Sequence, residues 1–238
     1  MVNSDFAALV PYAPAVARSE FQQELYEVEA LVQDEARLCR HALQSVMQAL
    51  HLRDVREAED VIARDDEIDI LHVKIESAIE DMLARQAPMA VDLRLVLALI
   101  HINLHLERIG DQCVNIAKLS LLMGAESLPI ELGEDLSSMG AQADAMIGHA
   151  MQAFGARDLA AAEQLVEMDQ VVNSTNYGLA RRILTSDGDA EVGLRAIVIG
   201  RCLERVGDNA VDIGERTAYL VTAEFREFTD ASHPVQPG

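Results

Sequence analysis

The sequence predicts an all-α protein made of two tandem antiparallel three-helix bundles related by an internal repeat. Trp is absent and only 6 of the 238 residues are Pro, whereas Ala, Leu, Glu and Arg are abundant, which favours helices over strands. Apolar residues recur at helical spacing over stretches much longer than the usual helix of about three turns. A charged motif also occurs twice. We expect the two units to span residues 19–124 and 134–229.

Three long helices are predicted in the first unit, over residues 19–51, 54–87 and 89–123. Ser19, followed by Gln22, has the spacing of a capping box and is expected to start the first helix. Asp54 opens the second helix, which ends before Pro88 because proline disfavours a helical conformation in the residue before it. Gly124 is expected to end the third helix.

The second unit repeats this plan, with helices predicted over residues 134–154, 158–185 and 189–228. The stretch 124–133, which contains Pro129, is expected to link the two units as a loop. Gly155 is expected to close the fourth helix, and Ser186–Gly188 to separate the fifth helix from the sixth. The segments before residue 19 and from Asp230 onward lack periodicity and are expected to be loose ends.

The charge of the chain excludes some classes of partner. A formal net charge of -21 repels phosphate backbones and anionic lipid surfaces, so we expect neither nucleic-acid binding nor direct membrane insertion. Cations and basic protein surfaces are better partners for such a chain. An acidic surface also keeps proteins soluble, and this explanation needs no partner.

Several features favour a cytoplasmic location. The longest apolar stretch, Leu93–Leu106, is interrupted by polar residues and is shorter than the ~18 residues that a membrane span requires. No basic residue precedes Arg18, so the N-terminus lacks the charged start of a secretory signal. The cysteines, Cys39, Cys113 and Cys202, lie far apart in helical patterns and are expected to be buried thiols in a reducing compartment.

The internal repeat is clearest in one charged motif. Glu107–Asp111, with the sequence Glu-Arg-Ile-Gly-Asp, recurs as Glu204–Asp208, with the sequence Glu-Arg-Val-Gly-Asp. Each copy lies midway along the third helix of its unit. A weaker match pairs Asp65–Asp69 with Asp169–Asn173 on the second helix of each unit.

The repeated acids predict a cation site. Residues four apart lie on one face of a helix, so Asp65 points the same way as Asp69, and Glu107 the same way as Asp111. If the second and third helices are neighbours, the four carboxylates converge into an all-oxygen site for hard cations such as Mg²⁺, Mn²⁺ or iron. The alternative is that these acids simply face solvent.

Two glycines favour a metal site or a structural polar cluster over plain surface charge. Gly110 and Gly207 occupy the same place in the two motifs, and each weakens its helix by about 1 kcal/mol relative to alanine. Such a cost in both copies indicates that a neighbouring group packs closely against the backbone.

The chain resembles the PhoU family of phosphate-uptake regulators. Asp92-Leu93-Arg94 after Pro88, Asn115-Ile116, and the two copies of the charged motif are similar to that family's repeated signature, in a register covering about residues 20 to 228. The resemblance implies two antiparallel three-helix bundles, polynuclear clusters of multivalent metal ions (iron, zinc, manganese or magnesium) and frequent homodimers. It further implies negative regulation of phosphate uptake and of the phosphate-starvation response. The implied partners are the ATPase of a phosphate ABC transporter and a sensor histidine kinase at the inner face of the membrane.

By motif, the family's metal ligands carry over to Asp65, Asp69, Glu107 and Asp111 in the first unit and to Asp169, Glu204 and Asp208 in the second. Asn173 departs from this pattern, since an acid is expected there. Asp212, one turn beyond Asp208, stands where the first unit has Asn115, and we expect it to restore the missing carboxylate. The alternative is that Asp212 is a solvated surface acid.

Three histidines lie near these acids in the sequence. His72 shares the face of Asp65 and is a minor candidate ligand. His101 and His105 point well away from Glu107 around the helix, so we expect them at the surface or between helices.

Two other functions compete with a regulatory adaptor. Four carboxylates in a helical bundle also suit a di-iron oxidase, but that class needs Glu-x-x-His motifs, and no histidine here follows a glutamate at that spacing. A passive scaffold with solvated acids is the second alternative. The sequence has no nucleophile paired with a base and no phosphate-binding glycine loop, so we do not expect an enzyme.

Overall fold

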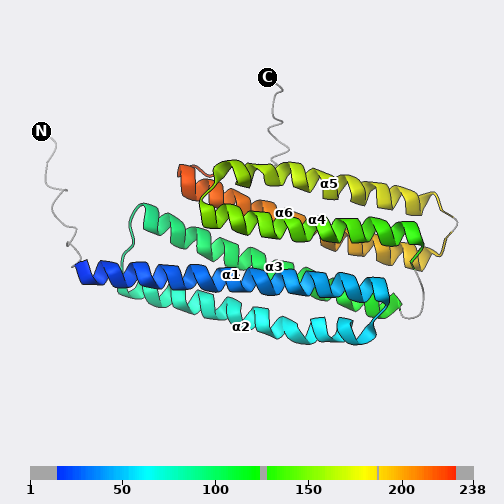
Figure 1. Ribbon diagram of the computed structural model, residues 1–238, viewed down its shortest axis with the longest axis horizontal. Coiled ribbons are helices and arrows are strands. Elements are labelled where there is room, and N and C mark those ends of the chain that lie inside the picture. The colour runs from blue at the N-terminus through cyan, green and yellow to red at the C-terminus, as the bar shows by residue number, and fades with distance from the viewer. Residues whose placement is uncertain (1–14, 124–127, 187, 229–238) are drawn as a thin grey trace, which may run out of the picture.

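The computed structural model describes residues 15–123, 128–186 and 188–228, and these residues form six α-helices (Figure 1). Their bounds are α1 (Ala15–Leu52), α2 (Val55–Arg85), α3 (Val91–Met123), α4 (Ile130–Ala156), α5 (Leu159–Leu184) and α6 (Ala190–Thr222). Helices α1 to α3 form one antiparallel bundle and α4 to α6 form the other. The predicted fold class, two tandem three-helix bundles, is confirmed.

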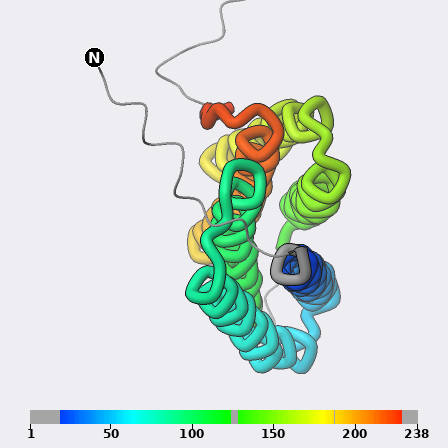
Figure 2. The backbone as a smooth tube through the Cα atoms, turned by 90° about the vertical axis from the view of Figure 1, so that its left-hand side faces the viewer, coloured from blue at the N-terminus to red at the C-terminus, as the bar shows by residue number. Residues whose placement is uncertain are grey.

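The two bundles share one hydrophobic core. Helix α3 packs along α6, and α1 packs along α4, so that the bundles lie side by side with their long axes aligned (Figures 1 and 2). Fully buried side chains such as Leu99 and Ile102 on α3 and Ile199 and Leu203 on α6 belong to the same apolar cluster. Burying these apolar surfaces against each other is the main force that joins the two units.

Ion pairs add to the contact between α1 and α4. Two guanidinium nitrogens of Arg40, Nε and Nη2, each lie 2.8 Å from a carboxylate oxygen of Asp144. This two-pronged arrangement is the strongest form of an arginine–carboxylate pair, and it lowers the pKa of Asp144, although burial alone would raise it. Arg157, which follows α4, reaches Glu29 on α1 at 2.7 Å.

Three aspartates begin helices as the sequence predicts. The carboxylate of Asp54 accepts hydrogen bonds from the backbone N–H groups of residues 56 and 57, and that of Asp189 accepts them from residues 191 and 192. Asp158 accepts one from the N–H of residue 161. Arg53 and Arg157, just before two of these caps, adopt the left-handed conformation that turns the chain.

Some predicted helix ends are wrong. Helix α1 already includes residues 15–18, so Ser19 lies inside it and does not cap it. Helix α4 begins at Ile130, because Pro129 occupies the N-cap position, where a missing N–H costs nothing. Gly155 lies within the last turn of α4. Helix α6 stops at Thr222, where Ala223 turns into the left-handed region, rather than at residue 228.

The predicted loose ends over residues 1–14 and from Asp230 onward lie outside the described residues, as do Gly124 and Asp187. Within the described helices, none combines the length and the apolarity that crossing a membrane would require. The three cysteines are buried free thiols, as predicted.

Candidate functional site

The first group of predicted acids lies where α2 packs on α3. Asp65 and Asp69 come from α2, and Glu107 and Asp111 come from α3. Burial is the largest cause that raises the pKa of Asp65 to about 6, and the nearby charges of Asp69, Asp111 and Glu107 contribute to the same shift. The structure therefore brings these acids into one electrostatic neighbourhood, which we call the first acid cluster.

Close helix packing explains the glycine of the first motif. A Cβ atom on Gly110 would lie 3.1 Å from Cδ1 of Ile68 and 3.3 Å from Oδ1 of Asp65. Both distances are shorter than ordinary van der Waals contacts, so a side chain here would displace α2 or the Asp65 carboxylate. The prediction that a neighbouring group packs closely against this glycine is confirmed.

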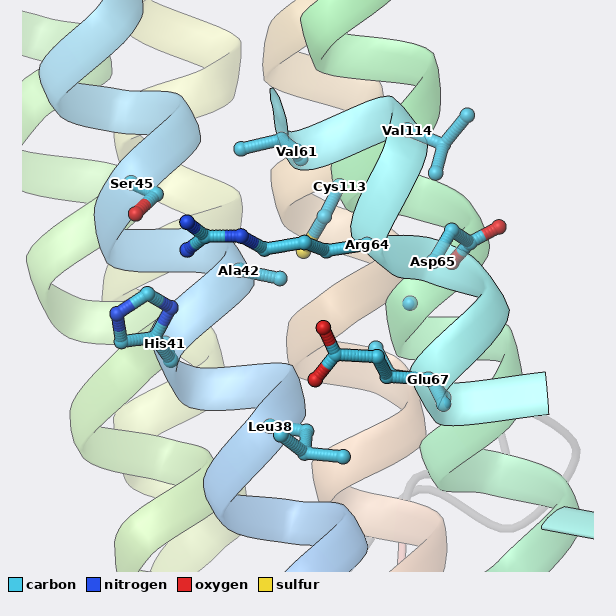
Figure 3. Close-up of a pocket in the computed structure, with 12 residues that line it drawn as sticks. Leu38, His41, Ala42, Ser45, Val61, Arg64, Asp65, Glu67, Cys113 and Val114 are labelled. Carbon is cyan, nitrogen blue, oxygen red and sulfur yellow. The ribbon is translucent and has the colours of Figure 1, made fainter. Parts of the chain in front are cut away.

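A pocket of about 370 Å³ opens beside this cluster, between α1 and α2, with Gly110 and Cys113 of α3 among its lining residues. Arg64 and Glu67 extend from α2 toward α1, whereas Asp65 lies on the side of α2 that faces α3 (Figure 3). Asp65 also lines the pocket, so the pocket and the first acid cluster share this carboxylate, while Arg64 and Glu67 border the pocket with a mixture of charges.

The second acid cluster contains Asp169 and Asn173 on α5 and Glu204 and Asp208 on α6. Asp169 is only 5% exposed, and burial, together with the charges of Asp208 and Glu204, raises its pKa to about 6. A Cβ atom on Gly207 would lie 3.0 Å from Oδ1 of Asp169, so this glycine has the same role as Gly110.

Two side-chain amides donate hydrogen bonds to acids of the second cluster. Nδ2 of Asn173 donates a hydrogen bond of 2.6 Å to Oδ2 of Asp169, which lowers the pKa of that carboxyl against the effect of burial. Nδ2 of Asn176 donates to Oε2 of Glu204, which also pairs with Arg201. Asn173, noted above as a departure from the acidic pattern, therefore serves as a donor to a neighbouring acid.

Asp212 lies between the second cluster and the first bundle. Its Oδ2 is 3.4 Å from Nδ1 of His105 on α3, and its charge contributes to the raised pKa of Asp208, for which burial is the largest cause. His105 is itself buried between α3 and α6, as the sequence predicts for an inter-helix histidine. The compensation of Asn173 by Asp212 stays a prediction.

A buried acid that was not among the predicted site residues lies beneath the first cluster. Glu35 on α1 has no solvent exposure, and neither of its carboxylate oxygens has a hydrogen-bond partner among the described residues. Burial, the larger cause, and the charge of Glu107 together raise its pKa to about 9. The nearest basic group is Nδ1 of His72, 3.8 Å from Oε1. An acid on the apolar stripe of Val28, Val32, Cys39 and Leu43 was the available signal.

The donor chemistry of both clusters fits hard cations. The ligands on offer are carboxylate oxygens, and several have raised pKa values because burial and then the crowding of like charges disfavour the charged form. Oδ1 of Asp169 is buried without a partner among the described residues. The side chains as they stand do not chelate one ion: within the described residues, no group of three or more His, Cys, Asp or Glu converges closely enough to hold a metal. Cation binding at these clusters therefore requires the carboxylates to move together.

Comparisons with known proteins agree with the two-bundle fold. The PhoU domain family matches the chain twice, over residues 32–120 and 136–217. A Burkholderia protein named phosphate-specific transport system accessory protein PhoU homolog is 30% identical over 222 residues, which cover 90% of this chain and 92% of that protein.

Two crystal structures share the fold. The phosphate transport system regulatory protein PhoU from Streptococcus pneumoniae superposes with a TM-score of 0.81 at 28% identity, over 87% of this chain and 99% of that one. PhoU from Pseudomonas aeruginosa superposes with a TM-score of 0.80 at 27% identity, over 86% and 100% of the two chains.

Proposed function

This chain belongs to the PhoU family, and on that premise we propose that it is the accessory protein of a phosphate-specific transport system and represses phosphate uptake and the phosphate-starvation response. The observation that carries this proposal is the match of both repeats to the PhoU domain, together with relatives named as transport-system accessory proteins over most of their length. The protein acts by binding partners rather than by catalysing a reaction.

We further propose that the two acid clusters bind multivalent cations, with magnesium, manganese, iron and zinc as the candidates. The raised pKa values of Asp65 and Asp169 support this, because crowded carboxylates are costly unless a cation offsets their charge. Asp69, Glu107 and Asp111 complete the first ligand set, and Glu204, Asp208 and Asp212 complete the second. Several ions in one cluster would share these carboxylates.

The proposed partners are the ATPase of a phosphate ABC transporter and a sensor histidine kinase, and the proposed assembly is a homodimer. Large apolar side chains on outward faces of α2 and α5, such as Ile70, Val73 and Tyr177, support contacts with other protein surfaces. The protein then works in the cytoplasm and reaches the inner face of the membrane through these partners.

A deletion strain of the native host tests the function. With phosphate in excess, a reporter of the phosphate-starvation response should stay switched on in the deletion strain, and the wild-type gene should switch it off again. Normal repression without the gene would refute the proposal.

The same strain separates the regulatory role from the metal. A gene carrying Asp65→Ala and Glu107→Ala should restore repression less well than the wild type at equal protein level. If it restores repression fully while its metal content is reduced, the regulatory proposal stands and the metal has no part in it.

A further inference from the structure

The interface between α3 and α6, which we call the seam, has two sides, and the internal repeat places corresponding residues on them. Aligning the two copies of the charged motif places Cys202 of α6 at the position of His105 in α3. By the same register, Gln112 and Asn115 of α3 correspond to Asn209 and Asp212 of α6. Because α3 and α6 pack along each other, these residues form two related sets, one on each side of the seam.

One side of the seam is closed by a histidine. Nδ1 of His105 lies 2.9 Å from Oδ1 of Asn209 and 3.4 Å from Oδ2 of Asp212. The imidazole fills the space between the helices, and the amide of Asn209 is used on both its atoms, since its Nδ2 donates to the carbonyl oxygen of Arg205. His105 and Asn209 are therefore engaged with each other on this side of the seam.

The other side of the seam is open. A pocket of about 490 Å³ lies there, and its lining residues are Gln112, Asn115, Lys118, Leu119, Val198, Arg201, Cys202 and Arg205. Cys202 stands where the closed side has an imidazole, and its shorter side chain leaves the space empty. Gln112 is only 9% exposed, yet its amide makes no hydrogen bond to any residue that the structure describes. The side-chain amide of Gln112, on the wall of the pocket, offers a donor and an acceptor to a polar ligand.

The open side is also strongly cationic. Lys118, Arg201 and Arg205 line it, and no acidic side chain is among its lining residues. Lys118 replaces the acid Glu215 of the closed side, and Asn115 replaces Asp212. Lys118 and Arg205 form no ion pair within the described part of the chain, whereas Arg201 pairs with Glu204. Such a group is exceptional in a protein with a net charge of -21.

We propose that this pocket binds a phosphate-type oxyanion. Two guanidinium groups and an ammonium group supply charge for a doubly charged anion, and the amides of Gln112 and Asn115 supply neutral donors beside them. A single carboxylate would leave most of this positive charge unmatched. The pocket is larger than one phosphate ion, so the phosphoryl group arrives either as free phosphate or on a larger molecule. The pocket borders the second acid cluster, since Arg201 pairs with Glu204, but the inference does not depend on the proposed function.

Binding to the full-length, chelator-treated protein tests the proposal, because stripping the metals removes any anion held by bound cations. Isothermal titration with inorganic phosphate, and separately with ATP, is run against a chloride control at equal ionic strength. Binding of phosphate identifies the free ion as the ligand, and binding of ATP alone identifies a phosphoryl group on a larger molecule. No binding of either at millimolar concentration would overturn the proposal.

Matched variants locate the site. Lys118→Gln with Arg205→Gln should weaken binding about ten-fold or more, since each removes a charge-assisted hydrogen bond. Arg108→Gln changes the exposed arginine of α3 that corresponds to Arg205 and should leave affinity within about two-fold. Equal losses in both variants would mean that general charge attracts the anion, and the proposal would fail.

A third variant changes the space without changing the charge at neutral pH. Cys202→His copies the residue of the closed side, so it should fill the pocket and weaken binding while the helical circular dichroism stays that of the wild type. Unchanged affinity in a folded Cys202→His protein would contradict the proposed position of the anion.

Discussion

The two acid clusters come from one repeated motif, yet they balance their charge differently. In the second bundle, Asn173 and Asn176 donate hydrogen bonds to Asp169 and Glu204. In the first bundle, the residues that correspond to those amides are Asp69 and His72, and a further acid, Glu35, is buried beneath them.

The helix caps define this correspondence. Counted from the matching turns at Asp54 and Asp158, Glu35 corresponds to the apolar Met139, and His72 corresponds to Asn176. The second cluster therefore offsets part of its charge with its own amides, whereas the first retains more uncompensated carboxylate. We infer that the first cluster depends more strongly on a bound cation.

The largest expected effect concerns the buried acid. With a pKa of about 9 in the fold and an ordinary value of 4.5, Glu35 holds a proton that the unfolded chain releases between those values. The free energy of unfolding should therefore fall as pH rises through this range. Metal-free wild-type protein should lose stability between pH 5 and pH 8, and Glu35→Gln should make this loss smaller by about 2 kcal/mol.

Urea denaturation at the two pH values measures this change. Met139→Gln, at the matching position of the second bundle, is the control and should leave the pH dependence as it is. Parallel pH profiles for the wild type and Glu35→Gln would contradict the raised pKa.

A smaller effect is expected from the two aspartates with pKa values of about 6. Because their ordinary value is 3.8, each lowers the stability of the metal-free fold as pH rises toward 6, and the cost remains above it. Asp65→Asn or Asp169→Asn should raise the free energy of unfolding at pH 7 by about 1 kcal/mol. This is less than the full shift implies, because solvent screens the charge of Asp65 and because Asp169→Asn also alters the hydrogen bond from Asn173. Added Mn²⁺ should then stabilise the wild type more than either variant. A loss of stability in both variants without metal would contradict this account.

The smallest expected effect concerns Asp212. If it supplies the carboxylate that Asn173 lacks, Asp212→Asn should lower the metal bound by the second bundle, while Asn115→Ala should not. The cost to stability should stay below about 0.5 kcal/mol, because Asp212 is 43% exposed beside a histidine whose pKa is lowered by burial. Full metal content in Asp212→Asn would show that the partner of Asp212 is His105 alone.

Local sequence patterns predict the helices and the pairs of acids four residues apart on one helix, because both depend on residues near each other in the chain. Asp54, Asp158 and Asp189 marked helix starts correctly through a single capping hydrogen-bond pattern. The sequence pattern places Pro129 in a loop, but proline also suits the start of a helix, and here it precedes α4. The end of α6 was missed because alanine, not glycine, adopts the left-handed turn there.

The buried acid and the seam could not be predicted in the same way. Glu35 has helical spacing like its apolar neighbours, and only the packing of α1 on the other helices determines that it is enclosed. The contact of His105 with Asn209 depends on how the two bundles pair, which no periodicity within one helix encodes.

Metal content shows whether the two acid clusters bind multivalent cations. Protein purified from the native host is analysed by inductively coupled plasma mass spectrometry as wild type, as Asp65→Ala with Glu107→Ala, and as Asp169→Ala with Glu204→Ala, each checked for helical circular dichroism. We expect multivalent metal in the wild type, a large loss in the first double variant and a smaller loss in the second. A wild type without metal above the buffer blank, or two folded variants that keep the full complement, would contradict the account.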